Sequence, residues 1–376
     1  MRESGILMPV SSLPGPYGIG CFGKEAFEFV DFLAQAGQKI WQILPLSPTG
    51  YGDSPYQSCS AFAGNPYFID LDTLKEEGLL TAAQLKAEKW GTDPKEVDYG
   101  TLYVSRFKVL RTAYAAWRKQ CARLHGCAYY FPDDYYAFTL ANEDWLEDYA
   151  LYMALKAANK MKNWVEWDKP YRLRDRKALA AFAAENEEEI GFWKFVQYKF
   201  AAQWQAVKAY ANKKDVQILG DIPIYVSADS VDAWVGGALF ELDADGGFAR
   251  VAGCPPDYFS ADGQLWGNPL YNWEYHKKTG TTVLLVSHSM EDIAKYANRV
   301  LVMHRAKIAM YDTVENVFAR AQELLELGLS VPQVTQIFLK LRQMGLDIPA
   351  DVYTIPYAVK TIQKALAAKQ GGRANA

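Results

Sequence analysis

Two short apolar runs flank a helical pattern within the first 46 residues, and this succession constrains the fold more than any other feature. Residues 5–10 (GILMPV) and 39–46 (KIWQILPL) each read as a buried strand. Between them, residues 24–37 place their apolar side chains on one helical face. Because parallel strands need a long crossover connection, usually a helix, the succession predicts a βαβ unit and a parallel sheet.

A third buried strand is expected much later, at residues 215–226 (DVQILGDIPIYV), with a polar end at Asp221. Residues 73–210 are mostly helical in pattern and too long for a simple crossover, so they predict an inserted subdomain. Long stretches rich in Gly, Pro and aromatic residues, at 47–72 and 227–273, are expected to be loops.

The amino-acid composition of the chain changes near residue 280. All 11 tryptophans lie before residue 274, and residues 281–376 contain only six aromatic residues. Such a shift in composition is typical of a domain boundary. After it we expect a strand at 281–288 (TTVLLVSH), then a helix, a strand or hairpin arm, and helices to about residue 370.

Bulk properties exclude several classes of protein. The net charge of −4 does not favour nucleic acid or an anionic membrane as partner. No apolar run approaches the roughly 18 residues that span a bilayer, and the first ten residues do not resemble a signal peptide. The scattered cysteines lack the spacing of a metal site and are expected to be reduced, which indicates a cytoplasmic protein. They are Cys21, Cys59, Cys121, Cys127 and Cys254.

Two glycine-rich stretches match nucleotide-binding motifs only weakly. Residues 18–23 (GIGCFG) fit G-x-G-x-x-G, but a loop separates them from the preceding strand, and the next strand ends in Leu44 and Pro45 rather than an acid. The overlapping P-loop pattern would need a hydroxyl where Glu25 stands. We therefore expect no dinucleotide, no bound metal and no other cofactor.

Three segments mix aromatic residues with Asp and Asn next to expected strands: residues 51–71, 220–235 and 254–273. Aromatic rings suit the apolar faces of sugar rings, and carboxylates and amides suit their hydroxyls. Barrel enzymes place their site loops after strands. The three segments together predict a carbohydrate-binding site.

GDSPYQS with SAFAGNPY, GDIPIYV, and PPDYFSADGQLWGNPLYNW resemble the motifs of the 4-α-glucanotransferases, also called amylomaltases or disproportionating enzymes. The resemblance covers about residues 5–280. It implies a (β/α)8 barrel with inserted helical subdomains. It also implies a cofactor-free, retaining transfer of α-1,4-glucan segments between maltodextrins.

The resemblance assigns substrate contacts to Tyr56, Asp221, Asp257, Tyr258, Phe259, Trp266 and Asn268. Tyr56 and Trp266 would stack on glucose rings, and Asp221 would hold hydroxyls near the cleaved bond. Tyr258 and Phe259 would lie in a flexible loop that excludes water on the acceptor side, which favours transfer over hydrolysis.

The family's catalytic residues have no counterpart. Retaining transfer needs a carboxylate nucleophile and a second carboxyl as acid/base about 5 Å away. In the family these are the Asp of R-I-D-H-F-R-G and the Glu of A-E-D-L-G, followed by a third Asp, and all would lie beyond residue 280. None of these stretches occurs in this chain. We therefore expect an incomplete barrel, no catalytic residue and little or no activity.

Residues 279–310 (TGTTVLLVSHSMEDIAKYANRVLVMHRAKIAM) instead resemble the end of an ABC-transporter ATPase domain of the energy-coupling-factor type. His288 would be a vestigial nucleotide switch at a strand end. A P-loop, an L-S-G-G-Q signature and a Walker B motif do not precede it, so ATP binding is not expected. The expected organisation is a truncated glucanotransferase barrel over 1–280 and an α/β ATPase fragment over 281–376.

Several functions remain open at this stage. The chain could act as a 4-α-glucanotransferase, or bind α-glucans without turnover. It could also be an accidental gene fusion or, least favoured, an ABC ATPase subunit.

Overall fold

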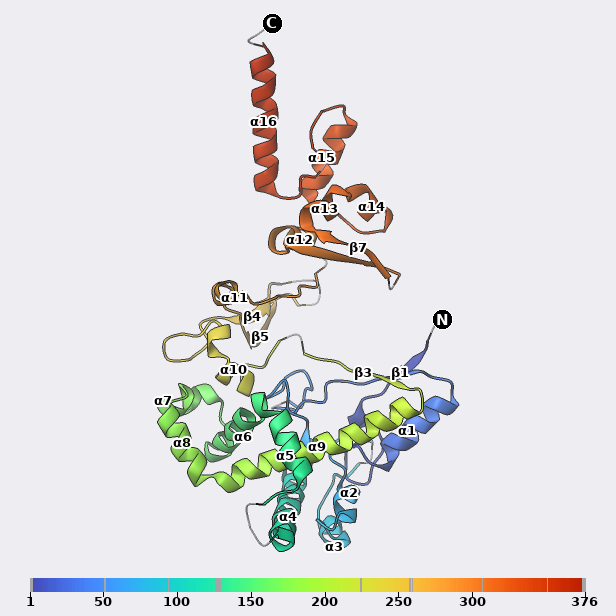
Figure 1. Ribbon diagram of the computed structural model, residues 1–376, viewed down its shortest axis with the longest axis vertical. Helices are drawn as coiled ribbons and strands as arrows, with labels where there is room; N and C mark the ends of the chain where they lie inside the picture. The colour runs from blue at the N-terminus through green and yellow to red at the C-terminus, as the bar shows by residue number, and fades with distance from the viewer. Residues whose placement is uncertain are drawn as a thin grey trace. The chain divides into compact units, whose positions relative to one another are not determined.

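The computed structural model forms two compact units, Met1–Thr279 and Gly280–Ala376 (Figure 1). The structure describes residues 3–50, 52–93, 95–125, 130–223, 225–256, 258, 260–287, 289–305, 307–349 and 351–373.

The first unit combines a small parallel sheet, a hairpin and many helices. Its strands are β1 (Gly5–Leu7), β2 (Ile40–Gln42), β3 (Gln217–Leu219), β4 (Val251–Cys254) and β5 (Gln264–Pro269). Its α-helices are α1 (Lys24–Gln35), α2 (Leu71–Glu76), α3 (Ala82–Lys86), α4 (Tyr99–His125), α5 (Asp133–Ala141), α6 (Glu143–Ala158), α7 (Lys169–Arg172), α8 (Arg176–Glu185), α9 (Glu187–Lys213), α10 (Val231–Val235) and α11 (Trp273–Thr279). Short 3-10 turns are η1 (Val10–Ser12), η2 (Pro66–Phe68), η3 (Trp164–Glu166) and η4 (Gly237–Leu239).

The parallel sheet confirms the predicted βαβ unit. Its order is β1-β2-β3, and both pairings are parallel. The central strand β2 carries the fully buried Trp41, whose indole donates a 2.8 Å hydrogen bond to the carbonyl of Met8. Gly5 allows β1 to approach, because a Cβ there would lie 2.6 Å from Cβ of Ile40. The three predicted strands therefore lie side by side in chain order.

Helix α9 connects the sheet to the helical part of the unit. It packs against α1 and β3 near one end and against α4, α5 and α6 along its length, so it crosses the whole unit in Figure 1. An aromatic cluster fills the space beneath it: Phe22 contacts Phe200 and Trp204 with ring centroids 5.2 and 5.3 Å apart. This packing joins the helical region and the sheet in one hydrophobic core.

Two buried glutamines of α9 hold the segment that leads into α2. The side chain of Gln197 accepts from the Gly64 N–H at 2.7 Å and donates to the Gly64 carbonyl at 2.9 Å. Gln203 makes the same pair of bonds with Asp70, at 2.6 and 3.1 Å. Buried backbone groups need such partners, so α9 fixes both ends of residues 64–70.

The second unit contains a hairpin and five helices among its described residues. The elements are α12 (Met290–Tyr296), β6 (Arg299–His304), β7 (Lys307–Thr313), α13 (Val314–Ala319), α14 (Ala321–Glu326), α15 (Gln333–Gln343) and α16 (Ile355–Arg373). β6 and β7 pair antiparallel, which resolves the expected strand or hairpin arm into a hairpin. A small core lies between the hairpin and α12 to α14.

The strand expected at 281–288 is wrong for the part that the structure describes. Residues 281–287 form no regular secondary structure, and Leu284 is 91% exposed. A continuous apolar run becomes a strand when neighbours pair with it on the sheet and cover its faces. No strand pairs with residues 281–287 among the described residues, so the local pattern alone does not produce one.

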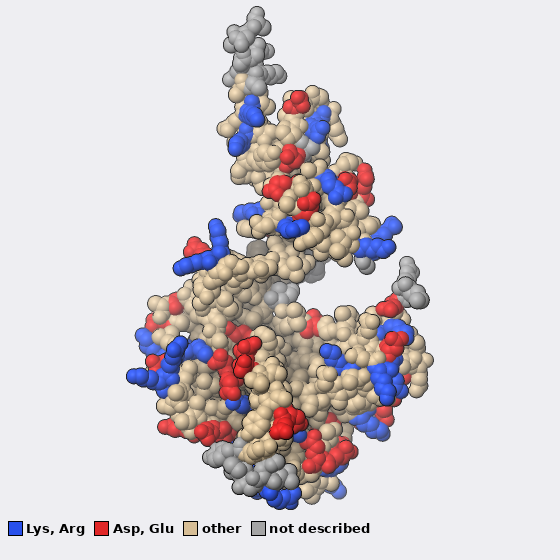
Figure 2. Space-filling view, in the orientation of Figure 1, with Lys and Arg blue, Asp and Glu red and all other residues tan. Residues whose placement is uncertain are grey.

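In the part of the chain that the structure describes, no helix is long and apolar enough to cross a membrane. Figure 2 shows Lys and Arg interspersed with Asp and Glu on the visible face of each unit. Several surface charges of the first unit form ion pairs, including Arg111 with Glu189 at 2.6 Å.

Candidate functional site

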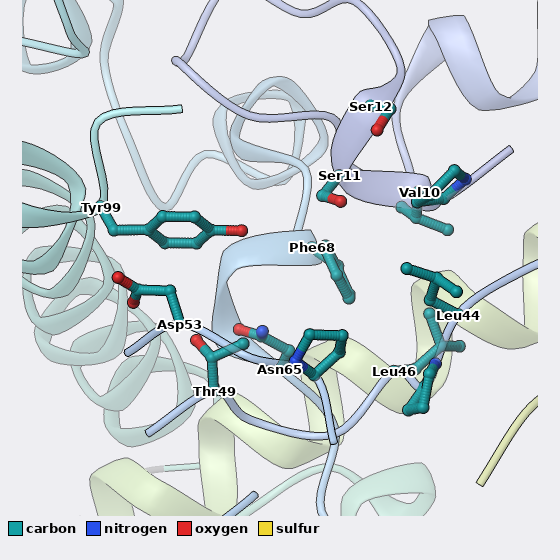
Figure 3. Close-up of a pocket in the computed structure, with 13 residues that line it drawn as sticks. Val10, Ser11, Ser12, Leu44, Leu46, Thr49, Asp53, Asn65, Phe68 and Tyr99 are labelled. Atoms are coloured by element: carbon teal, nitrogen blue, oxygen red, sulfur yellow. The ribbon is translucent and has the colours of Figure 1, made fainter. Parts of the chain in front are cut away.

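A cavity of about 230 Å³ lies beyond the carboxyl ends of β1 and β2 (Figure 3). Its lining residues are Pro9, Val10, Ser11, Ser12, Leu44, Pro45, Leu46, Thr49, Asp53, Pro55, Asn65, Phe68 and Tyr99. Val10 and Leu44 lie on one side in Figure 3, whereas Asp53 and Tyr99 lie on the other. Ligand sites of α/β sheets occur at this end of the strands. The cavity therefore offers an apolar wall facing hydroxyl and carboxyl groups.

Asp53 is the acidic group of this cavity. Partial burial raises the pKa of its carboxyl above the ordinary value. Burial also raises the pKa of the Tyr99 hydroxyl, and the negative charge of Asp53 adds to that effect. A neutral phenol beside a carboxylate can donate a hydrogen bond while the carboxylate accepts one, which suits a hydroxylated ligand.

Tyr56 and Asp221 form the first contact between the predicted sugar-binding segments. The Tyr56 hydroxyl donates a 2.7 Å hydrogen bond to Oδ2 of Asp221, which lies just after β3. The same contact raises the pKa of Tyr56, because ionisation would lose the bond and place two negative charges together. Both side chains are exposed, so both remain accessible to a ligand.

Further hydrogen bonds join the loop after β2, at residues 59–61, to the first residues of α10. The Ala61 N–H donates to Oδ2 of Asp232 at 2.9 Å, and the Val231 N–H donates to the Cys59 carbonyl at 2.9 Å. Ser230 caps α10 by accepting from the Ala233 N–H at 3.1 Å. The loop after β2 is thereby held against the start of α10.

A buried charged group holds this junction to α6. The Lys156 ammonium lies 2.6 Å from Oδ2 of Asp229, and the Tyr152 hydroxyl donates to Oδ1 at 2.7 Å. The Lys156 side chain is 5% exposed, so its ammonium is largely removed from water and is paired with this carboxylate. Burial, followed by the charge of Asp229, raises the pKa of Tyr152 far above its ordinary value. Helix α6 therefore positions the segment that follows Asp221.

The third segment is a hairpin and not the expected loop. β4 and β5 pair antiparallel, with a register shift between Val251 and Gly253. Trp266 on β5 is 43% exposed, and its ring centroid lies 6.2 Å from that of Tyr225. Asn268 donates a 2.8 Å hydrogen bond to the Val226 carbonyl. The register shift falls at residues 266–268 of β5, where Gly267 has a φ of 77°, so regular side-chain alternation does not apply there. The ring contact with Tyr225 and the hydrogen bond to Val226 place Trp266 and Asn268 next to the segment that contains Asp221.

The predicted site residues therefore divide into three groups. Tyr56 and Asp221 bond directly, and Trp266 and Asn268 contact the residues just after Asp221. Tyr258 is almost fully exposed. The positions Asp257, Phe259 and His288 lie outside the residues that the structure describes.

Sequence reasoning overlooked the supporting groups. Asp53 and Asp229 lie within the predicted site segments 51–71 and 220–235, but no sequence pattern distinguishes them from the other acidic residues there. A lysine in the middle of an expected helix reads as a solvent-exposed charge. Only its burial beside Asp229 shows otherwise. Among the described residues no cluster of His, Cys, Asp and Glu suits a metal ion.

The comparisons with known proteins cover the first unit and extend a short way past its end at Thr279. A profile of the 4-alpha-glucanotransferase family matches residues 8–294. A 4-alpha-glucanotransferase of Clostridium butyricum is 47% identical over 274 residues, covering 72% of this chain and 54% of the relative. That of Thermus thermophilus is 45% identical over 282 residues, with 74% and 54% covered.

The solved structure of the amylomaltase from Streptococcus agalactiae in complex with acarbose is also similar. It is 46% identical, covers 74% of this chain and 55% of that chain, and has a TM-score of 0.69. The amylomaltase fold is a (β/α)8 barrel, and the described residues of this chain form a parallel sheet in the order β1-β2-β3. This chain spans about half the length of the curated relatives it matches. The parallel sheet, the site segments and these similarities together show that the chain belongs to the 4-alpha-glucanotransferase family over its N-terminal residues to about 294.

Proposed function

We propose that the first unit binds α-1,4-glucans and is the substrate-binding part of a 4-α-glucanotransferase. The observation that carries the proposal is the Tyr56–Asp221 hydrogen bond, which joins two sugar-binding segments at the carboxyl end of the sheet. Trp266 adds an exposed indole on a strand that is tied to the second segment through Asn268. The acarbose bound to the similar amylomaltase supports a saccharide as ligand.

The roles of the site residues follow from their chemistry. Tyr56 and Trp266 offer ring faces to glucose units, and the Asp221 carboxylate accepts from sugar hydroxyls. Asn268 positions the Asp221 segment through Val226. We assign the acceptor side to Asp257, Tyr258 and Phe259, on the resemblance of their segment to the family motif.

We propose that the chain by itself does not complete the transfer reaction. Retaining transfer proceeds through a glycosyl-enzyme intermediate, which needs a carboxylate nucleophile and a second carboxyl that protonates the leaving oxygen. The stretches that supply these groups in the family do not occur in this sequence. Binding without turnover is therefore the function that the residues support best.

Isothermal titration with maltoheptaose tests glucan binding. We expect heat of binding from the wild-type chain and an affinity about tenfold lower for Trp266→Ala, equivalent to ~1.4 kcal/mol. Tyr296→Ala is the control, because this exposed ring lies in the second unit. An absence of heat at millimolar glucan, or an equal loss in both variants, would contradict the proposal.

Incubation with maltotriose tests turnover separately. We expect no glucose and no longer maltodextrins at high protein concentration, because the carboxyl pair is missing. Products that persist in Asp221→Asn, but vanish when a carboxylate beyond residue 280 is replaced, would show that this chain supplies catalytic groups of its own.

We also propose that residues 280–376 derive from the C-terminal part of an ABC-transporter ATPase, joined after Thr279. The motif sequence of residues 279–310 supports this origin, and the boundary between the compact units falls at the same place. The order of helix α12, hairpin β6–β7 and terminal helices is consistent with it. The join would then be a fusion of two gene fragments.

The fusion and its nucleotide binding are separable by experiment. Cleavage after Glu274 and Glu291 yields the peptide 275–291, and its detection in the source cells would show that the join is translated. Thermal unfolding with and without Mg-ATP should give the same midpoint, because phosphate-binding motifs do not precede His288. A raised midpoint would favour an ATPase subunit instead.

We place the chain in the cytoplasm on its scattered cysteines, of which four are free in the described residues.

A further inference from the structure

We propose that the two open edges of the β1-β2-β3 sheet dock a second polypeptide that carries the remaining strands of a (β/α)8 barrel. The partner would be the part of a 4-alpha-glucanotransferase that has no counterpart in this chain. This surface adjoins the glucan site, because Asp221 lies just after β3, but the proposal does not depend on glucan binding.

In the three-stranded sheet, β2 is paired on both sides, whereas β1 and β3 are the edge strands. In the described residues β1 and β3 each pair only with β2. The registers Ile6 with Trp41 and Trp41 with Ile218 place the three strands level. A parallel edge presents a row of backbone donors and acceptors that a further parallel strand can pair with.

In the described residues, the two edge strands lack two common protections against pairing, namely charged side chains and prolines. Natural edge strands are shielded by charged side chains, prolines, bulges or a covering element. β1 reads GIL and β3 reads QIL, without a charge or a proline. Leu219 at the end of β3 is 51% exposed, and Ile222 just beyond it is 82% exposed. Such apolar groups are normally covered in a parallel sheet, since its strands are buried on both faces.

Strand order and chain length identify the occupant. The order β1-β2-β3 is that of consecutive barrel strands, and a barrel removes every edge by closing on itself. The similar amylomaltase structure is covered over 55% of its length, so close to half of it has no counterpart here. A polypeptide with that half would supply a neighbour to β3 on one side and to β1 on the other. A second copy of this chain would bring only the same two edges.

Co-expression tests the docking surface. The unmatched part of the Streptococcus agalactiae amylomaltase, carrying an affinity tag, is produced in the same cells as the full-length chain. The quantity measured is the amount of this chain that co-purifies with the tagged fragment from the soluble fraction. We expect stoichiometric recovery with the wild-type chain.

Two variants locate the contact. Leu219→Lys places a charge at the β3 edge, and we expect at least a tenfold loss of co-purification. Leu140→Lys is the matched control, because Leu140 is an exposed leucine of α5, 70% accessible, that lies away from the sheet. Unchanged tryptophan-monitored unfolding of both variants shows that the fold persists, since every tryptophan lies in the first unit.

Three results would overturn the proposal. They are no recovery of the wild-type chain with the fragment, equal losses in the two variants, or recovery of this chain with a tagged second copy of itself that Leu219→Lys abolishes. Because maltoheptaose titration is measured on the chain alone, failure of the docking and failure of glucan binding give different results.

Discussion

The ammonium of Lys156 lies 2.6 Å from Oδ2 of Asp229, and the two groups differ sharply in exposure. The lysine side chain is 5% exposed, whereas that of the aspartate is 36% exposed. The pair holds α6 to the segment between Asp221 and α10. An unequal pair of this kind predicts unequal effects when either partner is removed.

Replacement of the aspartate should destabilise more than replacement of the lysine. Asp229→Asn leaves a buried ammonium without its counter-charge, and we expect a loss of about 3 kcal/mol in unfolding free energy. Lys156→Met leaves a carboxylate that still reaches water and Tyr152, so we expect a loss of about 1 kcal/mol. Urea unfolding followed by tryptophan fluorescence measures the first unit alone.

The exposed pair Lys169–Asp245, at 3.8 Å, supplies the control for these variants. Lys169→Met should change stability by less than about 0.5 kcal/mol. The double variant Lys156→Met, Asp229→Asn should be close to Lys156→Met alone. A larger loss in Lys156→Met than in Asp229→Asn would contradict the assignment of the buried charge.

We expect Gln197 to stabilise residues 64–70, the segment that leads into α2. Gln197→Leu removes both partners of the Gly64 backbone, and leaving these buried groups unpaired should cost about 2–4 kcal/mol. Gln120→Leu is a suitable comparison, because Gln120 is only half-buried and donates long bonds of 3.3 Å to two carbonyls. Equal unfolding midpoints for the two variants would show that Gln197 is dispensable.

Asp232 should make the first unit less stable as pH rises. Burial raises the pKa of its carboxyl above 3.8, although the Ala61 N–H opposes the shift. The folded state therefore binds more protons than the unfolded state between 3.8 and the folded pKa, so the contribution of Asp232 to stability falls through that window. Asp232→Asn keeps an acceptor for Ala61 and loses this titration.

Measurement of unfolding free energy from pH 3.5 to 7 compares the two proteins. We expect the stability of Asp232→Asn, relative to wild type, to increase as pH rises through the window. A constant difference between the proteins across this range would show that Asp232 titrates alike in both states.

Two cysteines should resist alkylation in the native protein. Burial raises the pKa of Cys21 and of Cys59 to about 12, so about one thiol in ten thousand is ionised at pH 8. Cys59 and Cys254 are both partly exposed, and Cys254, on β4, provides the internal comparison. Mass spectrometry after iodoacetamide treatment at pH 8 should find Cys254 modified first. Modification of Cys21 at the rate seen in urea would contradict its burial.

The hydrophobic pattern of the sequence correctly predicted the first strands and the helix between them. The apolar runs and the helical periodicity of residues 24–37 became β1, α1 and β2, because chain-adjacent strands and a crossover helix have few ways to pack. The same reasoning was wrong for residues 281–287. An apolar run there has strand-like composition, but a strand forms only where other backbone is present to pair with it.

The family resemblance identified the site segments, while their geometry came only from the fold. Tyr56 and Asp221 are 165 residues apart in the chain, and no sequence pattern shows that they share a 2.7 Å hydrogen bond. Trp266 was expected in a loop and lies on β5.

The sequence by itself determined the parallel βαβ start, the family of the first unit and the break in composition near residue 280. The tertiary structure decided which polar side chains are buried: Lys156, Gln197 and Gln203 lie on helices where the sequence suggests solvent. The physical reason is that burial is a property of packing between distant segments, whereas periodicity records only which face of an element is apolar. The open edges of the sheet are likewise visible only in three dimensions, because an edge is defined by the neighbour that a strand lacks.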